Sequence, residues 1–214
     1  IKLTALQKFK LNDDFKFLAS SLAMLANDVE NIDELTALPF PNTQRTVKEE
    51  ITHNIATIGE NMMLRRMKNI KVNKGAIVSY VHNATAEGMG RIGVLVALES
   101  DLKIDILNDV GKQIAMHVAA TKPVSLSVED LDPSIVQRER EVLIEQAKQT
   151  GKPQEIAEKM VEGRIRKFYQ EVVLLEQTFV IDGESKVADV LKKTAHQAGG
   201  EIVLKEFSLF VLGD

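Results

Sequence analysis

The 214-residue sequence has no cysteine, no tryptophan and only two tyrosines. Without cysteine, disulfide bonds and thiolate metal sites are excluded. The shortage of aromatic side chains argues against a protein that binds nucleic acid by stacking bases on its surface. Apolar runs such as IGVLVAL are far shorter than the ~20 residues of a transmembrane helix. No signal peptide is recognised at the start of the sequence.

Charged and nucleophilic motifs are equally sparse. The formal net charge of −4 at pH 7 gives no sign of the basic surface that nucleic-acid binding normally uses. The four histidines form no H-E-x-x-H pair, and no G-x-S-x-G elbow or Walker A motif occurs. We therefore expect no metal site, no bound cofactor, no nucleic-acid or membrane partner and no enzymatic centre.

The spacing of apolar residues predicts an α+β fold, in which helices pack on antiparallel strands, and not the regular β-α-β alternation of a parallel sheet. Helices are predicted at four places: from Asn12 onward, from Thr46 to about Met67, from Leu102 to Ala120 and from Ser185 to Ala198. Strands are predicted at residues 1–6, 76–83, 91–100 and 201–213. We expect two subdomains, residues 1–121 and 122–214, each with a small antiparallel sheet packed against helices.

The second subdomain is predicted to carry an antiparallel helical hairpin over residues 133–171. Gly151 is a helix stop and Pro153 a helix start, so the chain reverses between them. Val142, Leu143 and Ala147 on the first arm are expected to face Ile156 and Val161 among others on the second. The many charges on the outer faces suggest an arm that projects into solvent.

Residues 88–93, GMGRIG, have the G-x-G-x-x-G spacing of a dinucleotide-binding loop. That site requires a helix after the glycines, because the helix N-terminus holds the pyrophosphate. Here the glycines precede VLVALE, a predicted strand, so we interpret them as a hairpin turn. Two alternatives stay open: an enzyme that binds a dinucleotide in this loop, and an adaptor that uses the helical hairpin without catalysis.

Two further positions allow more than one interpretation. Gly59 lies inside the predicted helix 46–67, where it can allow another backbone to approach, and Arg65 and Arg66 can cap that helix. His117 borders the apolar stripe of the helix predicted from Leu102. It is either a packed histidine at the edge of the core or a group offered to a partner.

Four motifs closely resemble those of the elongation factor Ts family: IGENMMLRR, GRIGVLVALE, IAMHVAATKP and GKPQEIAEKMVEGRIRKFYQEVVLLEQTFV. They occur in the family's order, and the resemblance covers nearly all of residues 12–206. It implies a non-enzymatic guanine-nucleotide exchange factor that binds elongation factor Tu with GDP and promotes GDP release. The N-terminal subdomain would contact the partner's GTPase domain and the C-terminal subdomain its third domain, in the bacterial cytoplasm or in an organelle matrix or stroma.

The resemblance also implies partner contacts at individual residues. Ile92 and Gly93 match an apolar-glycine contact, and His117 matches a histidine that presses on the GTPase domain. Phe9 can stand for the aromatic residue of a family wedge, N-C-E-T-D-F-V, although Lys8 replaces the acidic residue before it. The family's N-terminal three-helix module has no counterpart, so we expect it to be absent.

Overall fold

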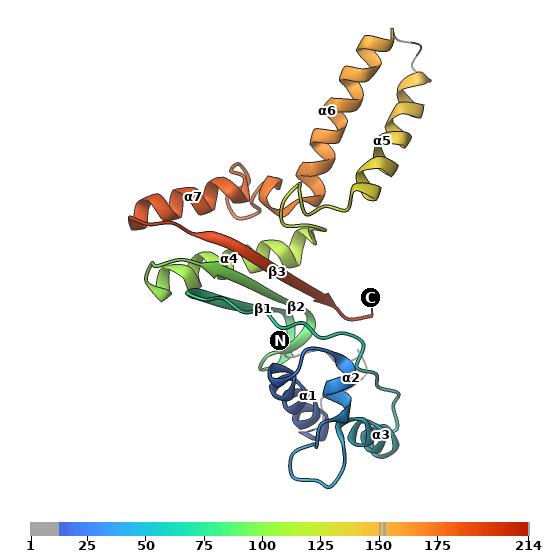
Figure 1. Ribbon diagram of the computed structural model, residues 1–214, viewed down its shortest axis with the longest axis vertical. Helices are drawn as coiled ribbons and strands as arrows, with labels where there is room; N and C mark the ends of the chain where they lie inside the picture. The colour runs from blue at the N-terminus through green and yellow to red at the C-terminus, as the bar shows by residue number, and fades with distance from the viewer. Residues whose placement is uncertain (1–12, 150, 152, 214) are drawn as a thin grey trace.

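The computed structural model describes residues 13–149, 151 and 153–213, and its centre is a three-stranded antiparallel sheet. The strands are β1 (Gly75–Ala86), β2 (Met89–Glu99) and β3 (Val203–Val211), in the order β1–β2–β3. Helices cover both faces of the sheet, and a pair of helices projects from one end of the molecule (Figure 1). The α+β class predicted from the sequence is confirmed.

The turn between β1 and β2 is shorter than the predicted linker. It consists of Glu87 and Gly88, and Gly88 has the positive φ of 66° that such tight turns need. The register shifts between Ala84 and Ala86, which marks a β-bulge beside the turn. The predicted hairpin is therefore present, and all residues of GMGRIG after the turn belong to β2.

One face of the sheet is covered by α4 (Ile104–Thr121) and α7 (Val187–Ala198). Alternate β2 side chains, Val94, Val96 and Leu98, are at most 1% exposed and belong to the main apolar core. Helix α4 packs its apolar face against them: Leu107, Val110 and Ile114 from the predicted stripe are buried there, and Val118 joins them.

The prediction of a separate sheet in each half is wrong for the described residues. Strand β3 pairs with β2, so the second half of the chain completes the sheet that the first half begins. Leu191 and Leu204 from the second half also share the main core with α4. The division into subdomains 1–121 and 122–214 remains a prediction.

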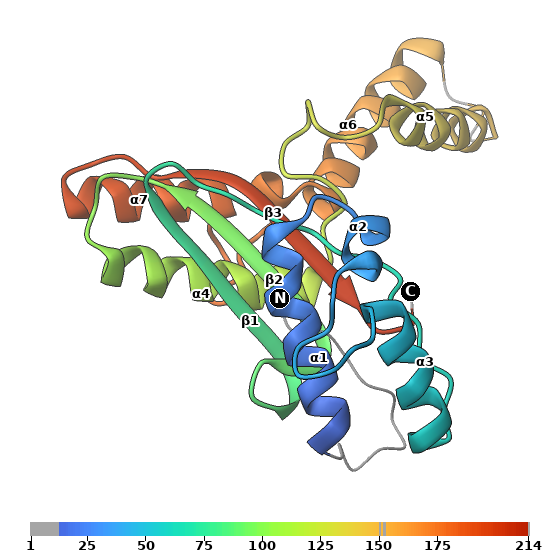
Figure 2. The same ribbon diagram turned by 60° about the horizontal axis from the view of Figure 1, so that its bottom comes forward.

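The opposite face of the sheet looks toward a small helical module (Figure 2). The module contains α1 (Asp13–Leu25), the 3-10 helix η1 (Ala26–Asp28), α2 (Ile32–Ala37) and α3 (Val47–Ile58). It has its own apolar cluster around Leu18, Phe40 and Val47. Helix α3 begins with a capping box in which Thr46 and Glu49 satisfy each other's backbone amides.

The helix predicted to reach Met67 ends at Ile58, and residues 60–72 form neither helix nor strand. Gly59 is its left-handed C-cap, with φ 80°, and the Gly59 N–H donates to the Ile55 carbonyl over 2.9 Å. The interpretation of Gly59 as an interior helical residue is therefore wrong. Arg65 and Arg66 do not cap α3, because they lie in the extended segment that follows it.

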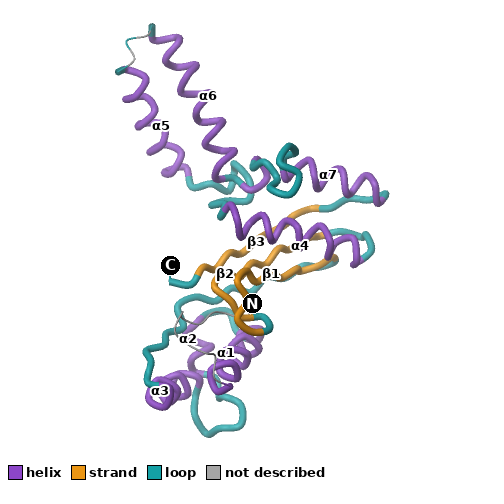
Figure 3. Tube along the Cα trace, turned by 180° about the vertical axis from the view of Figure 1, so that it is seen from behind, coloured by secondary structure: helices purple, strands orange, loops and turns teal. Residues whose placement is uncertain are grey.

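The projecting pair consists of α5 (Pro133–Lys148) and α6 (Gln154–Val172), which lie side by side (Figures 1 and 3). The short 3-10 helix η2 (Leu174–Glu176) leads back to the core. The pair has a separate apolar cluster of Leu143, Ala147, Val161 and Ile165. Val142 and Ile156, expected to face the other arm, are 49% and 47% exposed instead.

Within the described part of the chain, no helix has both the length and the apolar character needed to cross a bilayer.

The conformation of Gly59 predicts opposite effects for two glycine-to-alanine substitutions. Gly59→Ala should lower the free energy of unfolding by about 1 kcal/mol, because alanine is strained at positive φ. Gly163→Ala in α6 should raise it by about 0.5–1 kcal/mol, because alanine is the better helix former. Neither new methyl group meets another atom within 4 Å. Urea unfolding followed by circular dichroism measures both; stabilisation by Gly59→Ala would contradict the assigned cap.

Candidate functional site

The predicted contact residues Ile92 and Gly93 lie at the start of β2, on opposite faces of the sheet. Ile92 is half-buried and packs against the main core on the α4 face. Gly93 is buried and lies opposite Val81 of β1 and Phe210 of β3. Phe9, the fourth predicted contact, lies outside the described residues.

His117 lies in the last turn but one of α4. The connection between β2 and α4 is short, so strand and helix run in opposite directions and His117 is at the same end of the sheet as Ile92. Its side chain has no solvent exposure at all. The burial agrees with the first of the two interpretations, a packed histidine, whereas a role of His117 toward a partner remains a prediction.

Both ring nitrogens of His117 are hydrogen-bonded. Nε2 lies 2.8 Å from Oε1 of Gln177, an acceptor, so Nε2 carries the proton. Nδ1 then accepts a hydrogen bond of 3.2 Å from the backbone N–H of Val180. The Phe179 ring packs beside the imidazole, with centroids 5.7 Å apart. The neutral imidazole thus donates to the Gln177 side chain through one ring nitrogen and accepts from the Val180 backbone through the other.

Gln177 is the residue that the sequence analysis missed. Its Oε1 also lies 2.9 Å from the Thr121 hydroxyl, and its Nε2 donates to the Glu171 carbonyl over 2.7 Å. The side chain is 3% exposed. Gln177 therefore joins the end of α4 to the end of α6. Nothing in the periodicity of the sequence marks this residue, because it follows a helix and belongs to no strand.

Burial lowers the pKa of His117 below its ordinary value of 6.5, and the hydrogen bond to Gln177 offsets this only in part. The hydrogen-bond partners of the imidazole are uncharged, so no anion compensates a proton on the ring. The neutral form is favoured in the folded protein.

The hydrogen bond from Val180 fixes a surface loop, residues 178–186, onto α4. The loop closes on itself through a bridge between Thr178 and Lys186 and through the Phe179 N–H, which donates to Ser185. Its outer side carries Val180 and Ile181, which are 48% and 51% exposed. His117 is thus buried beneath the loop that carries these two exposed apolar side chains.

The glycine motif has a structural role in the hairpin. A Cβ atom on Gly90 would lie 2.5 Å from a Val81 methyl group and 2.8 Å from the His82 carbonyl oxygen. Gly90 is therefore needed for the close approach of β1 and β2. The motif continues into a strand, so no helix N-terminus faces the glycines. Among the described residues, no cluster of three potential metal ligands occurs either.

Comparison with known proteins identifies a family. The family model described as "Elongation factor TS" matches residues 10–214. Proteins named elongation factor Ts are 47% identical in Rhodospirillum centenum, 52% in Gluconobacter oxydans and 48% in Rickettsia bellii. Each alignment covers 95% of this chain and 65–66% of the relative. The chain therefore spans slightly less than two thirds of the length of these relatives.

The buried geometry of His117 predicts a large effect on stability. His117→Ala should lower the free energy of unfolding by about 1–3 kcal/mol, because it removes a fully buried ring, takes one of two hydrogen bonds from Gln177 Oε1 and leaves the Val180 N–H without its acceptor. His53→Ala, at an exposed histidine of α3, should change it by no more than about 0.5 kcal/mol. Chemical denaturation compares the two variants, and equal small effects would show that His117 does not support the fold.

The lowered pKa also predicts a pH dependence. Well above pH 6.5 the imidazole is neutral in both the folded and the unfolded state, so its contribution to stability is complete. As the pH falls below that value, the unfolded chain binds a proton that the folded protein resists, and stability decreases. Between about pH 7.5 and pH 5, His117→Gln should show a shallower loss of stability than the unchanged protein. Identical slopes in denaturant melts would contradict this assignment.

Proposed function

The chain belongs to the elongation factor Ts family, and from this we propose that it is a guanine-nucleotide exchange factor for elongation factor Tu. In this proposal the chain is not an enzyme: it binds the partner with GDP and promotes GDP release during translation elongation. The observation that carries the proposal is the family match over residues 10–214. The bacterial relatives are consistent with a cytoplasmic protein.

The geometry of the glycine motif supports an exchange factor over a nucleotide-binding enzyme. Gly90 is required by the close approach of β1 and β2, and it lies within β2, so the glycines lead into a strand and not into a helix. We propose that the nucleotide is held by the partner, and that exchange results from weaker GDP binding in the complex. Linkage then requires that GDP weakens the association of the two proteins by the same factor.

The proposed surface lies at the end of the sheet where β2 begins and α4 ends. We propose that the GTPase domain of the partner contacts Ile92, Gly93 and Phe9. The C-terminal part of the chain would contact the partner's third domain. His117 is buried, so we propose that it acts by holding the 178–186 loop, which then presents Val180 and Ile181. Direct contact of His117 with the partner would require this loop to move.

An adaptor that uses α5 and α6 remains the second candidate function. The observation that favours it is the separate apolar cluster of this pair, with Val142 and Ile156 exposed on its surface. An adaptor would associate with elongation factor Tu without changing the rate of GDP release. Release of a fluorescent GDP from elongation factor Tu, with and without this chain, distinguishes the two candidates, and an unchanged rate would exclude exchange.

Two isoleucines with equal exposure test the proposed surface. Ile181 and Ile104 are both 51% exposed, but Ile104 begins α4 at the end opposite His117. Ile181→Glu should slow stimulated GDP release by about tenfold, because it places a charge in an apolar contact. Ile104→Glu should leave the rate unchanged, and both variants should keep their thermal stability. Equal rates for the two variants would place the contact elsewhere.

A further inference from the structure

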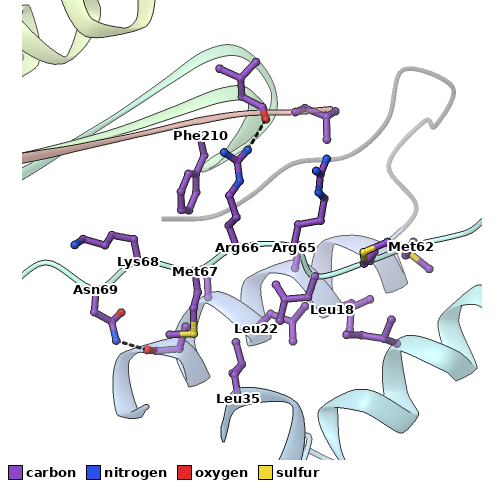
Figure 4. Close-up of a pocket in the computed structure, with 18 of the residues that line it drawn as sticks. Leu18, Leu22, Leu35, Met62, Arg65, Arg66, Met67, Lys68, Asn69 and Phe210 are labelled. Carbon is purple, nitrogen blue, oxygen red and sulfur yellow. Dashed lines mark hydrogen bonds between the residues drawn. The ribbon is translucent and has the colours of Figure 1, made fainter. Parts of the chain in front are cut away.

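A cavity of about 560 Å³ lies between the helical module and the sheet, on the face away from α4 (Figure 4). Its volume is within the range of small-molecule sites. The extended segment 60–71 runs through it, with residues of α1 and α2 on one side and of β1, β2 and β3 on the other. The proposed exchange activity makes no use of this cavity.

The walls of the cavity are mostly apolar. On the module side they include Leu18, Leu22 and Leu35, and on the sheet side Leu95 and Phe210. The segment adds three methionines, Met62, Met63 and Met67. Methionine side chains are flexible and polarisable, so they adapt to ligands of irregular shape. The lining continues from α2 to the end of β3, which suits an elongated ligand.

The same segment gives the cavity an excess of positive charge. Arg65, Arg66, Lys68 and Lys71 line it, whereas Glu60 is the one acidic residue among the described lining residues. Lys68 and Lys71 form ion pairs with Glu206 and Glu30, at 2.6 and 3.7 Å.

The two arginines rise from the segment toward the end of β3 (Figure 4). Arg66 donates to the Val211 carbonyl over 3.1 Å and stacks on Phe210, 5.0 Å from the ring centroid. Arg65 makes no hydrogen bond or ion pair within the described part of the chain. Its guanidinium is therefore the group best placed to bind an added anion.

We propose that this cavity binds a monomeric long-chain carboxylate, with the carboxylate at Arg65 and the alkyl chain against the leucines, methionines and Phe210. A guanidinium binds a carboxylate through two parallel hydrogen bonds, and the apolar walls favour an alkyl chain over a polar anion. The bound chain would contact both the module and the sheet, so it would stabilise their relative position.

Methionine methyl groups report binding directly. In the full chain labelled with ¹³C at the methionine methyl groups, dodecanoate below its micelle concentration should shift the Met62, Met63 and Met67 signals. Met24 and Met116 lie outside the cavity, and their signals should stay unchanged. Equal shifts at all methionines, or none, would overturn the proposal. Shifts that require anionic vesicles in place of monomeric dodecanoate would overturn it as well.

A matched pair of arginine variants tests the charged end of the ligand. Arg65→Gln should weaken dodecanoate binding about tenfold, the value of one lost charge-assisted hydrogen bond. Arg138→Gln, at an exposed arginine of α5, should leave the affinity unchanged. Dodecanol, which lacks the charge, should bind Arg65→Gln and the unchanged protein alike. If Arg65→Gln binds dodecanoate as tightly as the unchanged protein does, the assignment of Arg65 to the carboxylate is wrong.

Discussion

The central strand β2 is the constraint on which the rest of the structure depends. Every residue from Gly93 to Leu98 is buried, so β2 needs hydrogen-bond partners on both edges and apolar cover on both faces. The edges are satisfied by β1, which directly precedes β2 in the chain, and by β3, which lies near the C-terminal end of the described chain. One face is covered by α4 and α7, which bury Val94 and Val96 completely or nearly so. The two halves of the chain are thereby joined into a single core.

The second face is covered differently. The helical module has its own apolar cluster and reaches the sheet through the extended segment that follows Gly59. Polar contacts anchor this segment: Arg66 binds the end of β3, while Asn69 donates to the Ala26 and Val29 carbonyls over 2.7 Å. Between these anchors the packing is incomplete, and the cavity is the result. Because only a few contacts anchor the helical module to the sheet, a ligand that contacts both the module and the sheet can stabilise their relative position.

The environment of His117 shows how a core residue can shape a surface. The imidazole is buried and neutral, and it holds Gln177 on one side and Val180 on the other. The exposed apolar side chains of Val180 and Ile181 are therefore fixed by groups that a partner does not reach directly. Substitution of His117 would alter the surface through the loop, so its effects on folding and on binding are coupled.

The sequence by itself determined the α+β class, the β1–β2 hairpin and α4, because each of these depends on local periodicity and a nearby turn. Motif similarity likewise indicated the family. Only the tertiary structure decided that β3 completes the first sheet, since strand pairing between distant segments has no local signal. It also decided where the helix before Gly59 ends. In the sequence Met62 and Met67 continue the helical spacing of apolar residues, but in the structure they follow the end of the helix and line a cavity. Whether His117 is exposed depended on Gln177 and Val180, which are 60 and 63 residues away in the sequence.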